Sequence, residues 1–255
     1  MNSVVWNNYN LKPAQSANYD LYFSFYNNTI GLFTAGGFIK EIKDMIFATN
    51  GRYVFESEDY PGIPSSAEGR PISTTLNNPN KVKLWGLEFD WQTHFWYLPG
   101  VLSGLVANVN YTHIFSEAKY PLSRVEIQYL EEPPYIIRTV IDTFYTNRFI
   151  SQPRDIVNFT IGYDYKDFST RVSMFYQTDI FKEENVWDEL TASADDYVRW
   201  DLSVKQTLPW YSVQLFLNIN NITSAMDVDL NKGRNKPTSE QHYGMTADIG
   251  VHWTL

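Results

Sequence analysis

Strict two-residue alternation at the end of the chain is the feature that most limits what this sequence can fold into. From Tyr243 to Leu255 every odd-numbered position is apolar, while the even-numbered positions from His242 to Thr254 are small or polar. Successive side chains of a β-strand point to opposite faces, so the segment predicts a strand with one apolar and one polar face. Transmembrane strands take about 9–11 residues, whereas strands of globular proteins are usually about 5–6 residues long. The length therefore favours the closing strand of an outer-membrane β-barrel.

Composition is compatible with that class of protein. Aromatic residues make up 16% of the 255 residues, yet the mean hydropathy is −0.34. No apolar run reaches the roughly 18 residues that a transmembrane helix needs. Barrel strands turn only half of their residues to lipid, which reconciles many aromatic residues with a low mean hydropathy. A soluble β-rich domain with aromatic binding faces fits the composition equally well.

Charge and cysteine content exclude several kinds of partner and site. The formal net charge of −9 argues against binding to nucleic-acid backbones. The chain has no Cys, so it has neither disulfides nor thiolate metal ligands. Met1–Trp6 lacks the basic start and apolar core of a signal peptide. Because a barrel must be exported, we expect a mature form or a piece of a longer protein.

Nine segments of the chain alternate with period two. They span residues 19–26, 31–43, 82–96, 104–115, 155–165, 168–180, 197–208, 212–222 and 242–255. In the last three, the side chains predicted to face lipid are Trp200, Leu202, Val204, Val213, Leu215, Leu217, Ile219, Met245, Ala247, Ile249 and Val251. The charged side chains predicted to face the lumen are Glu88, Asp90, Arg199, Asp201, Lys205 and Asp248. A water-filled lumen accepts these charges, whereas a packed sandwich interior does not.

The connections between these segments alternate between short and long. Short links lie near residues 27–30, 97–103, 166–167 and 209–211, and long links span 44–81, 116–154, 181–196 and 223–241. Tight periplasmic turns and long external loops are typical of outer-membrane barrels. Five aromatic residues at the short links and the last strand end predict a periplasmic girdle: Trp96, Tyr97, Trp210, Tyr211 and Trp253.

The number of strands predicts that the chain is part of a larger barrel. Nine is odd, whereas bacterial single-chain barrels have even strand numbers. If the last strand ends in the periplasm, the first runs inward from outside. Residues 1–18 would then form the end of an external loop, and residues 1–255 would be one barrel portion.

Several motifs carry a resemblance to a known family. They are Asn10-Leu11-Lys12-Pro13, Asn18-Tyr19-Asp20-Leu21, Phe38–Asp44, Trp85–Thr93, Phe95–Gly100, Asn110–His113, Ser116–Pro121, Asn218–Thr223 and the closing strand. Together they resemble the C-terminal barrel part of a TonB-dependent receptor, particularly the kind found in Bacteroidetes. The resemblance implies a barrel of about 22 strands around an N-terminal plug, preceded by a TonB-binding segment. Neither the plug nor that segment can be placed in this chain.

The resemblance also implies function, location and partners. It implies uptake of a nutrient, such as a siderophore or a glycan, across the outer membrane of a Gram-negative cell. The implied partners are outer-membrane lipid, the barrel-assembly machinery, the substrate and, through the missing plug region alone, TonB. Barrels of this family usually end in Phe, so Leu255 departs from the terminal assembly signal that Trp253 and Leu255 would form.

No motif nominates a catalytic, cofactor or metal site, and we expect neither an enzyme nor a cofactor. G-x-S-x-G, H-E-x-x-H and P-loop motifs are absent. His94, His113, His242 and His252 lie on separate segments. The series Asp227, Asp229, Asn231 and Gly233 only faintly resembles a calcium loop, because Lys232 and Thr238 replace the Gly and Glu of an EF-hand.

Two other interpretations remain open from the sequence. The chain could be a complete small barrel or passive pore, with a further strand in residues 1–18 or 135–150. It could instead be a secreted β-sandwich that binds carbohydrate on its aromatic residues. Dependence on detergent separates the sandwich from the barrels, and resistance of a closed barrel to SDS separates the two barrels.

Overall fold

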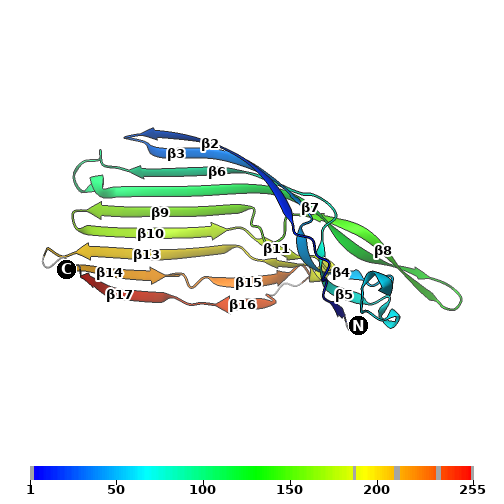
Figure 1. Cartoon of the computed structure of the whole chain (residues 1–255). Coiled ribbons are helices and arrows are strands. Elements are labelled where there is room, and N and C mark those ends of the chain that lie inside the picture. Colours follow the sequence, from blue (N-terminus) through cyan, green and yellow to red (C-terminus); the bar gives the residue numbers. More distant parts are fainter. Residues whose placement is uncertain (1–2, 186–187, 210–212, 234–236, 254–255) are drawn as a thin grey trace.

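The chain forms one long antiparallel meander (Figure 1). The computed structural model describes residues 3–185, 188–209, 213–233 and 237–253. Within this part of the chain, nine strands pair in sequence order, each with the next. They are β2 (Gln15–Asn27), β3 (Gly31–Lys43), β6 (Val82–His94), β7 (Leu105–Tyr129), β9 (Asp155–Tyr165), β10 (Phe168–Gln177), β13 (Tyr197–Thr207), β14 (Val213–Asn220) and β17 (Thr246–Trp253). None of the described helices is long and apolar enough to cross a lipid bilayer.

These nine strands correspond to the nine predicted segments. The bounds of β3 and β9 are as predicted, and most other ends differ by a few residues. The first strand begins at Gln15, so residues 15–18 belong to the sheet and not to a loop. The fourth strand, β7, runs to Tyr129 and not to Phe115.

The four connections predicted as long links contain further strands, and here the prediction of loops was wrong. Strands β1 (Val4–Trp6), β5 (Pro71–Asn77) and β4 (Ile46–Tyr53) form a small sheet in that order. Strand β8 (Ile136–Asn147) pairs with residues 118–129 of β7, which we call the far half of β7. Strands β11 (Ile180–Glu183), β12 (Ala192–Ala194), β15 (Met226–Asn231) and β16 (Ser239–His242) form another sheet. The short 3-10 helices are η1 (Ser57–Asp59), η2 (Ser65–Ala67), η3 (Gly100–Gly104) and η4 (Asp188–Leu190).

The far half of β7 shows why these strands escaped sequence reasoning. Alternation continues there, but Ala118 and Tyr120 are buried while Glu117 and Lys119 are exposed. The exposed side is charged, so the apolar stripe that signals a lipid-facing strand stops at Phe115.

Short connections gather at one end of the long sheet and long ones at the other, as predicted. The β2–β3, β6–β7, β9–β10 and β13–β14 connections lie at one end, to the left in Figure 1. We call this the turn end and the opposite end the loop end. Asn27 supports the first turn, because its Oδ1 accepts hydrogen bonds from the amides of Thr29 (2.9 Å) and Ile30 (3.3 Å).

Buried apolar side chains of the described residues all lie at the loop end. The larger cluster comprises Met45, Phe47, Val82, Leu84, Ala118, Tyr120 and Phe181. The smaller cluster comprises Val54, Tyr60 and Ile72. The larger cluster joins the ends of β6 and β7 to connecting segments, and the smaller cluster is made of connecting segments alone. The loop end therefore has its own core.

Candidate functional site

The residues predicted to face lipid share one face of the sheet. Directly opposed residues of an antiparallel pair lie on the same face. The register opposes Leu202, Ile219 and Ala247 across three strands, and likewise Val204, Leu217 and Ile249. Leu215 opposes Val251, and Val213 opposes Trp253. Trp200 lies two residues before Leu202 in β13 and therefore on the same face. Met245 immediately precedes β17.

This apolar face continues across the other six strands. Val172 opposes Ile161, which opposes Ala107, and farther along the sheet Trp91 opposes Phe33, which opposes Phe25. Its side chains are most exposed on the terminal strand β17, where 86% of Ile249 and 64% of Val251 are accessible, and most of those on the inner strands are half-buried. A contiguous apolar surface of this extent is far larger than the patches that soluble monomers expose.

The residues predicted to face the lumen lie on the opposite, polar face. Short polar side chains join neighbouring strands here. Ser24 Oγ and Thr34 Oγ1 are 3.0 Å apart, as are Thr160 Oγ1 and Ser173 Oγ. Ser203 Oγ donates to Asn218 Oδ1 at 2.8 Å. The strands therefore satisfy polar groups with one another across this face.

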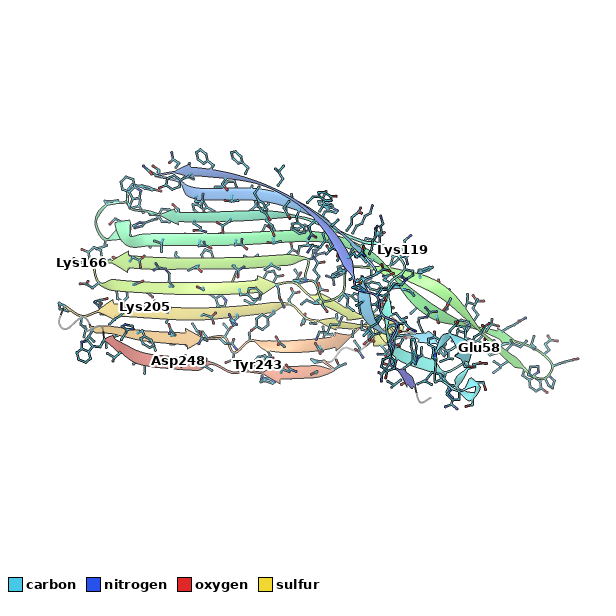
Figure 2. All side chains as sticks on the ribbon, in the orientation of Figure 1. Glu58, Lys119, Lys166, Lys205, Tyr243 and Asp248 are labelled. Atoms are coloured by element: carbon cyan, nitrogen blue, oxygen red, sulfur yellow. The ribbon has the colours of Figure 1, made fainter. Side chains whose placement is uncertain are left out.

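The six charged residues predicted for this face do not converge. Glu88 and Asp90 lie on β6, whereas Arg199, Asp201 and Lys205 lie on β13, with β7, β9 and β10 between them. Arg199 Nε donates to Asp201 Oδ2 at 3.1 Å. Lys205 and Asp248 lie on β13 and β17, toward the bottom of the sheet in Figure 2. The polar face is thus a long charged surface and not one compact site.

Sequence reasoning missed a recurring arrangement on the polar face, in which a large side chain lies over a glycine of the next strand. Tyr22 lies over Gly36 and donates its hydroxyl to Glu88. Arg171 lies over Gly162 and forms a double hydrogen bond with Asp164, at 2.8 and 2.6 Å. Phe38 over Gly86 and Phe216 over Gly250 repeat the arrangement. A glycine directly opposite a large residue on the neighbouring strand is the sequence signal for this arrangement. That signal can be recognised only when the register of the paired strands is known.

A small polar pocket of about 200 Å³ lies at the loop end of the polar face. Gln177 and Tyr197 extend the polar face to it, and β11, β12, β15 and β16 complete it. Lys182 forms an ion pair with Asp229, and Tyr243 donates its hydroxyl to Asp227 Oδ2 at 3.0 Å. The hydrogen bond to Asp227 raises the pKa of Tyr243. Figure 2 shows Tyr243 between β16 and β17.

The series that faintly resembles a calcium loop lies beside this pocket. Asp227 and Asp229 are in strand β15 and have the protein partners just named. In the part of the chain that the structure describes, no three His, Cys, Asp or Glu side chains converge as metal ligands would.

Aromatic side chains gather at the turn end. Trp96 and Tyr97 lie in the β6–β7 connection, and Trp253 ends β17. Trp96 Nε1 donates to the carbonyl of Asn28 at 2.7 Å, and Trp91 Nε1 donates to that of Ile30 at 2.8 Å. These bonds tie the β6–β7 connection to the β2–β3 turn. Trp210, Tyr211 and Leu255, also named from the sequence, lie outside the described residues.

Comparison with known families decides what this two-faced sheet is. The profile of the family described as "TonB dependent receptor-like, beta-barrel" matches residues 1–222. The chain belongs to the TonB-dependent receptor β-barrel family. The family is one of outer-membrane receptors and transporters of Gram-negative bacteria, and not a class of enzymes. The predicted all-β fold, an antiparallel portion of a transmembrane barrel, is confirmed, while a Bacteroidetes-type receptor stays a prediction.

Solved TonB-dependent receptors share the fold. The ferric enterobactin receptor PfeA of Pseudomonas aeruginosa, in complex with enterobactin, has a TM-score of 0.56 at 14% identity, covering 94% of this chain and 31% of that one. The FrpB iron transporter of Neisseria meningitidis gives 0.52 at 14% identity, covering 98% and 32%. FpvA of P. aeruginosa, bound to a pyoverdine–iron complex, gives 0.52 at 12% identity, covering 95% and 27%. No curated protein matches the sequence.

The chain spans about a third of the length of the solved receptors that it resembles. The similarity therefore concerns one portion of those barrels.

Proposed function

We propose that this chain is the C-terminal barrel portion of a receptor that takes up a nutrient across the Gram-negative outer membrane. The observation that supports this proposal most directly is the single nine-stranded sheet. One of its faces is continuously apolar, and the other is polar, with hydrogen bonds between neighbouring strands. The apolar face contacts lipid and the polar face lines the lumen. Removing each large apolar side chain from water contributes about 1.5–3 kcal/mol, so lipid contact strongly favours this orientation.

The free edges of the sheet support a portion of a larger barrel. In the described residues, β2 and β17 are the terminal strands of the meander and do not pair with each other. An unpaired edge is not stable in hydrocarbon, because its backbone donors and acceptors have no water to bind. Both edges pair with further strands in the complete barrel, which also holds the plug and the TonB-binding segment.

The orientation follows from the two ends of the sheet. The turn end, with Trp96, Tyr97 and Trp253, lies at the periplasmic interface, and the loop end faces outward. TonB reaches the receptor through the plug region, and the last strand, with Trp253 and Leu255, is what the barrel-assembly machinery engages.

The substrate is a small nutrient, a siderophore-like iron chelate being the first class to test and a glycan the second. The iron chelate is supported by the solved receptors of the same fold, which are named as iron or siderophore receptors. The pocket lined by Lys182, Asp195 and Tyr197 lies where a substrate entering from outside would first contact the polar face.

Paired cysteine substitutions test the orientation sharply, because the chain has no cysteine of its own. Val204→Cys and Lys205→Cys alter consecutive residues on opposite faces of β13. In receptor embedded in outer membranes, a small cationic thiol reagent should label the cysteine at position 205 and not that at position 204. A quencher attached to lipid acyl chains should reach only position 204.

A second pair, Asp248→Cys and Ile249→Cys on β17, repeats the comparison at the sheet edge. Equal labelling of both members of both pairs would contradict the proposed orientation. Uptake is then tested with radiolabelled ferric chelates and oligosaccharides in cells with and without TonB. Uptake that does not depend on TonB would favour a passive pore.

A further inference from the structure

Three lysines gather on the outward side of the sheet just beyond its apolar band. Lys81 immediately precedes β6, Lys83 is the second residue of β6, and Lys119 lies in β7. The residues that alternate with them, Val82, Leu84, Ala118 and Tyr120, are buried in the larger core cluster. Lys83 and Lys119 therefore point away from the core, on the side that carries the apolar face. Figure 2 shows Lys119 where the long sheet meets the loop-end sheets.

An aromatic pair forms the floor beneath these lysines. Trp85 and Phe115 oppose each other on β6 and β7, with ring centroids 3.9 Å apart and planes at 16°. Both remain exposed, at 47% and 40%. A pocket of about 560 Å³ lies over the pair and is lined by all three lysines, Asn80, Ser116 and Glu117. Trp side chains concentrate at membrane–water interfaces, so the pair marks the level of lipid headgroups.

Two carboxylates, Glu41 and Glu117, lie beside the three lysines, and Glu117 opposes Lys83 across β6 and β7. The protein therefore neutralises the lysine charges only in part. Glu41 is shared between Lys81 and Lys83, at 3.8 and 3.7 Å, and these ammonium-bearing side chains are 54% and 68% exposed. Ion pairs this long and exposed are weak. Among the described residues, no carboxylate lies within ion-pair distance of Lys119. The neighbouring arginines differ, since Arg148 pairs with Asp179 and Arg154 pairs with Asp155.

The cluster is also unusual for the chain as a whole, which carries a net charge of −9. Ammonium groups are effective phosphate ligands, acting as compact point charges with three donors each. Basic groups at the edge of a membrane attract anionic lipid headgroups for the same reason. Cations above an exposed aromatic floor, at the border of a lipid-facing surface, match a phosphorylated lipid.

We propose that this pocket binds the phosphorylated headgroup of an outer-leaflet lipid. Lys81, Lys83 and Lys119 contact the phosphates, while Trp85 and Phe115 pack against the start of the acyl chains. The inference rests on the proposed function, because it needs the apolar face in lipid and the loop end outside. It goes beyond that function because it assigns the receptor a specific lipid partner.

The test compares lipid retention by receptor purified from outer membranes in mild detergent, measured by native mass spectrometry. The triple variant Lys81→Gln, Lys83→Gln, Lys119→Gln keeps side-chain size and removes three charges. Lys166→Gln is the matched control, because Lys166 lies at the β9–β10 turn at the opposite end of the sheet (Figure 2). The probes are lipid A carrying its phosphates, the same lipid without phosphates, and inorganic phosphate as competitor.

Wild-type receptor and the Lys166→Gln control should retain phosphorylated lipid A equally. The triple variant should retain at least about tenfold less, and none of the three should favour the dephosphorylated lipid. Trp85→Ala alone should weaken retention while leaving some preference for phosphate. If the triple variant does not reach the outer membrane, Lys119→Gln alone is compared with Lys166→Gln in the same assay.

Three results would overturn the inference: undiminished retention by the lysine variants, equal retention of the two lipids by wild type, or displacement of lipid by inorganic phosphate. Each of these leaves the proposed function standing, provided that the receptor is found in outer membranes. Absence of the receptor from outer membranes would overturn both.

Discussion

The long sheet and the loop end are built from the same alternating strands but have opposite relations to solvent. At the loop end, Phe47, Ile72 and Tyr120 are buried in clusters formed by segments distant in sequence. Burial raises the pKa of Tyr120 to about 12, because the charged phenolate loses its hydration. Toward the turn end, the described strands of the sheet bury no apolar side chain, and Leu21, Phe23 and Ile249 are largely exposed. The loop end hides its apolar side chains from water, whereas the sheet needs lipid against its apolar face.

The difference shows that one chain uses two sources of stability. The loop end gains from close packing, so loss of packed atoms is costly there. The sheet gains from backbone pairing and from contact with lipid, so a side chain of the right polarity matters more there than its size. Four substitutions separate these two sources, in order of decreasing effect.

Truncation of the loop-end core should have the largest effect. Phe47 is buried and packs edge-on against Tyr120, with ring centroids 5.5 Å apart. We expect Phe47→Ala to destabilise the loop end by about 3–5 kcal/mol, through lost contacts and the cavity left behind. Hydrogen exchange of residues 46–53 should rise sharply while that of β13 and β14 stays unchanged. Phe23→Ala removes a ring of β2 from the apolar face and should leave hydrogen exchange of residues 46–53 unchanged.

A charge on the apolar face should have the next largest effect. Leu217 lies on that face of β14, and Phe216 lies on the polar face. We expect Leu217→Arg to destabilise the folded receptor in bilayers by about 2–4 kcal/mol, because the guanidinium loses water in hydrocarbon. Phe216→Arg should cost much less. Reversible unfolding in lipid vesicles measures both, and equal costs would remove the distinction between the faces.

Adjacent glycines of β3 allow a smaller and more local comparison. A Cβ on Gly36 would lie 2.1 Å from the Tyr22 ring, whereas a Cβ on Gly37 would find its nearest neighbour at 3.4 Å. We expect Gly36→Ala to displace Tyr22 from Glu88 and cost about 1–3 kcal/mol, as overpacking does. Gly37→Ala should be nearly neutral. The chain has 18 Tyr, so the fluorescence of Tyr22 alone cannot be followed. The two variants are therefore compared by their unfolding midpoints in lipid vesicles.

The smallest predicted effect concerns pH at the loop end. Burial raises the pKa of Glu183 above its ordinary value of 4.5, although Asn50 Nδ2 donates to its Oε1 at 2.5 Å. The folded state then binds this proton more tightly than the unfolded state, so stability falls as pH rises above 4.5 through the folded-state pKa. Glu183→Gln should remove that fall and slow proteolysis of residues 46–53 at neutral pH. Proteolysis that stays the same in the variant at neutral pH would contradict this role of Glu183.

Much of the architecture was accessible from the sequence by itself. Period-two alternation predicted the nine strands and the apolar and polar sides of β13, β14 and β17. The spacing of the segments predicted that short turns share one end with Trp96, Tyr97 and Trp253. Local patterns suffice here because the pleat alone decides which side of a strand each residue occupies.

The tertiary structure decided what depends on contacts between distant segments. No local pattern shows that Tyr22 lies over Gly36, or that Arg171 spans Gly162 to reach Asp164, since both need the register of paired strands. The loop-end strands were hidden because burial of Ala118 and Tyr120 depends on Met45 and Phe181, which lie far away in the chain. Lys81, Lys83 and Lys119 are scattered along the sequence and meet only when β6 pairs with β7. Alternation along the sequence predicts which side of a strand each residue occupies. Which residues of other strands lie next to it is decided only by the tertiary structure.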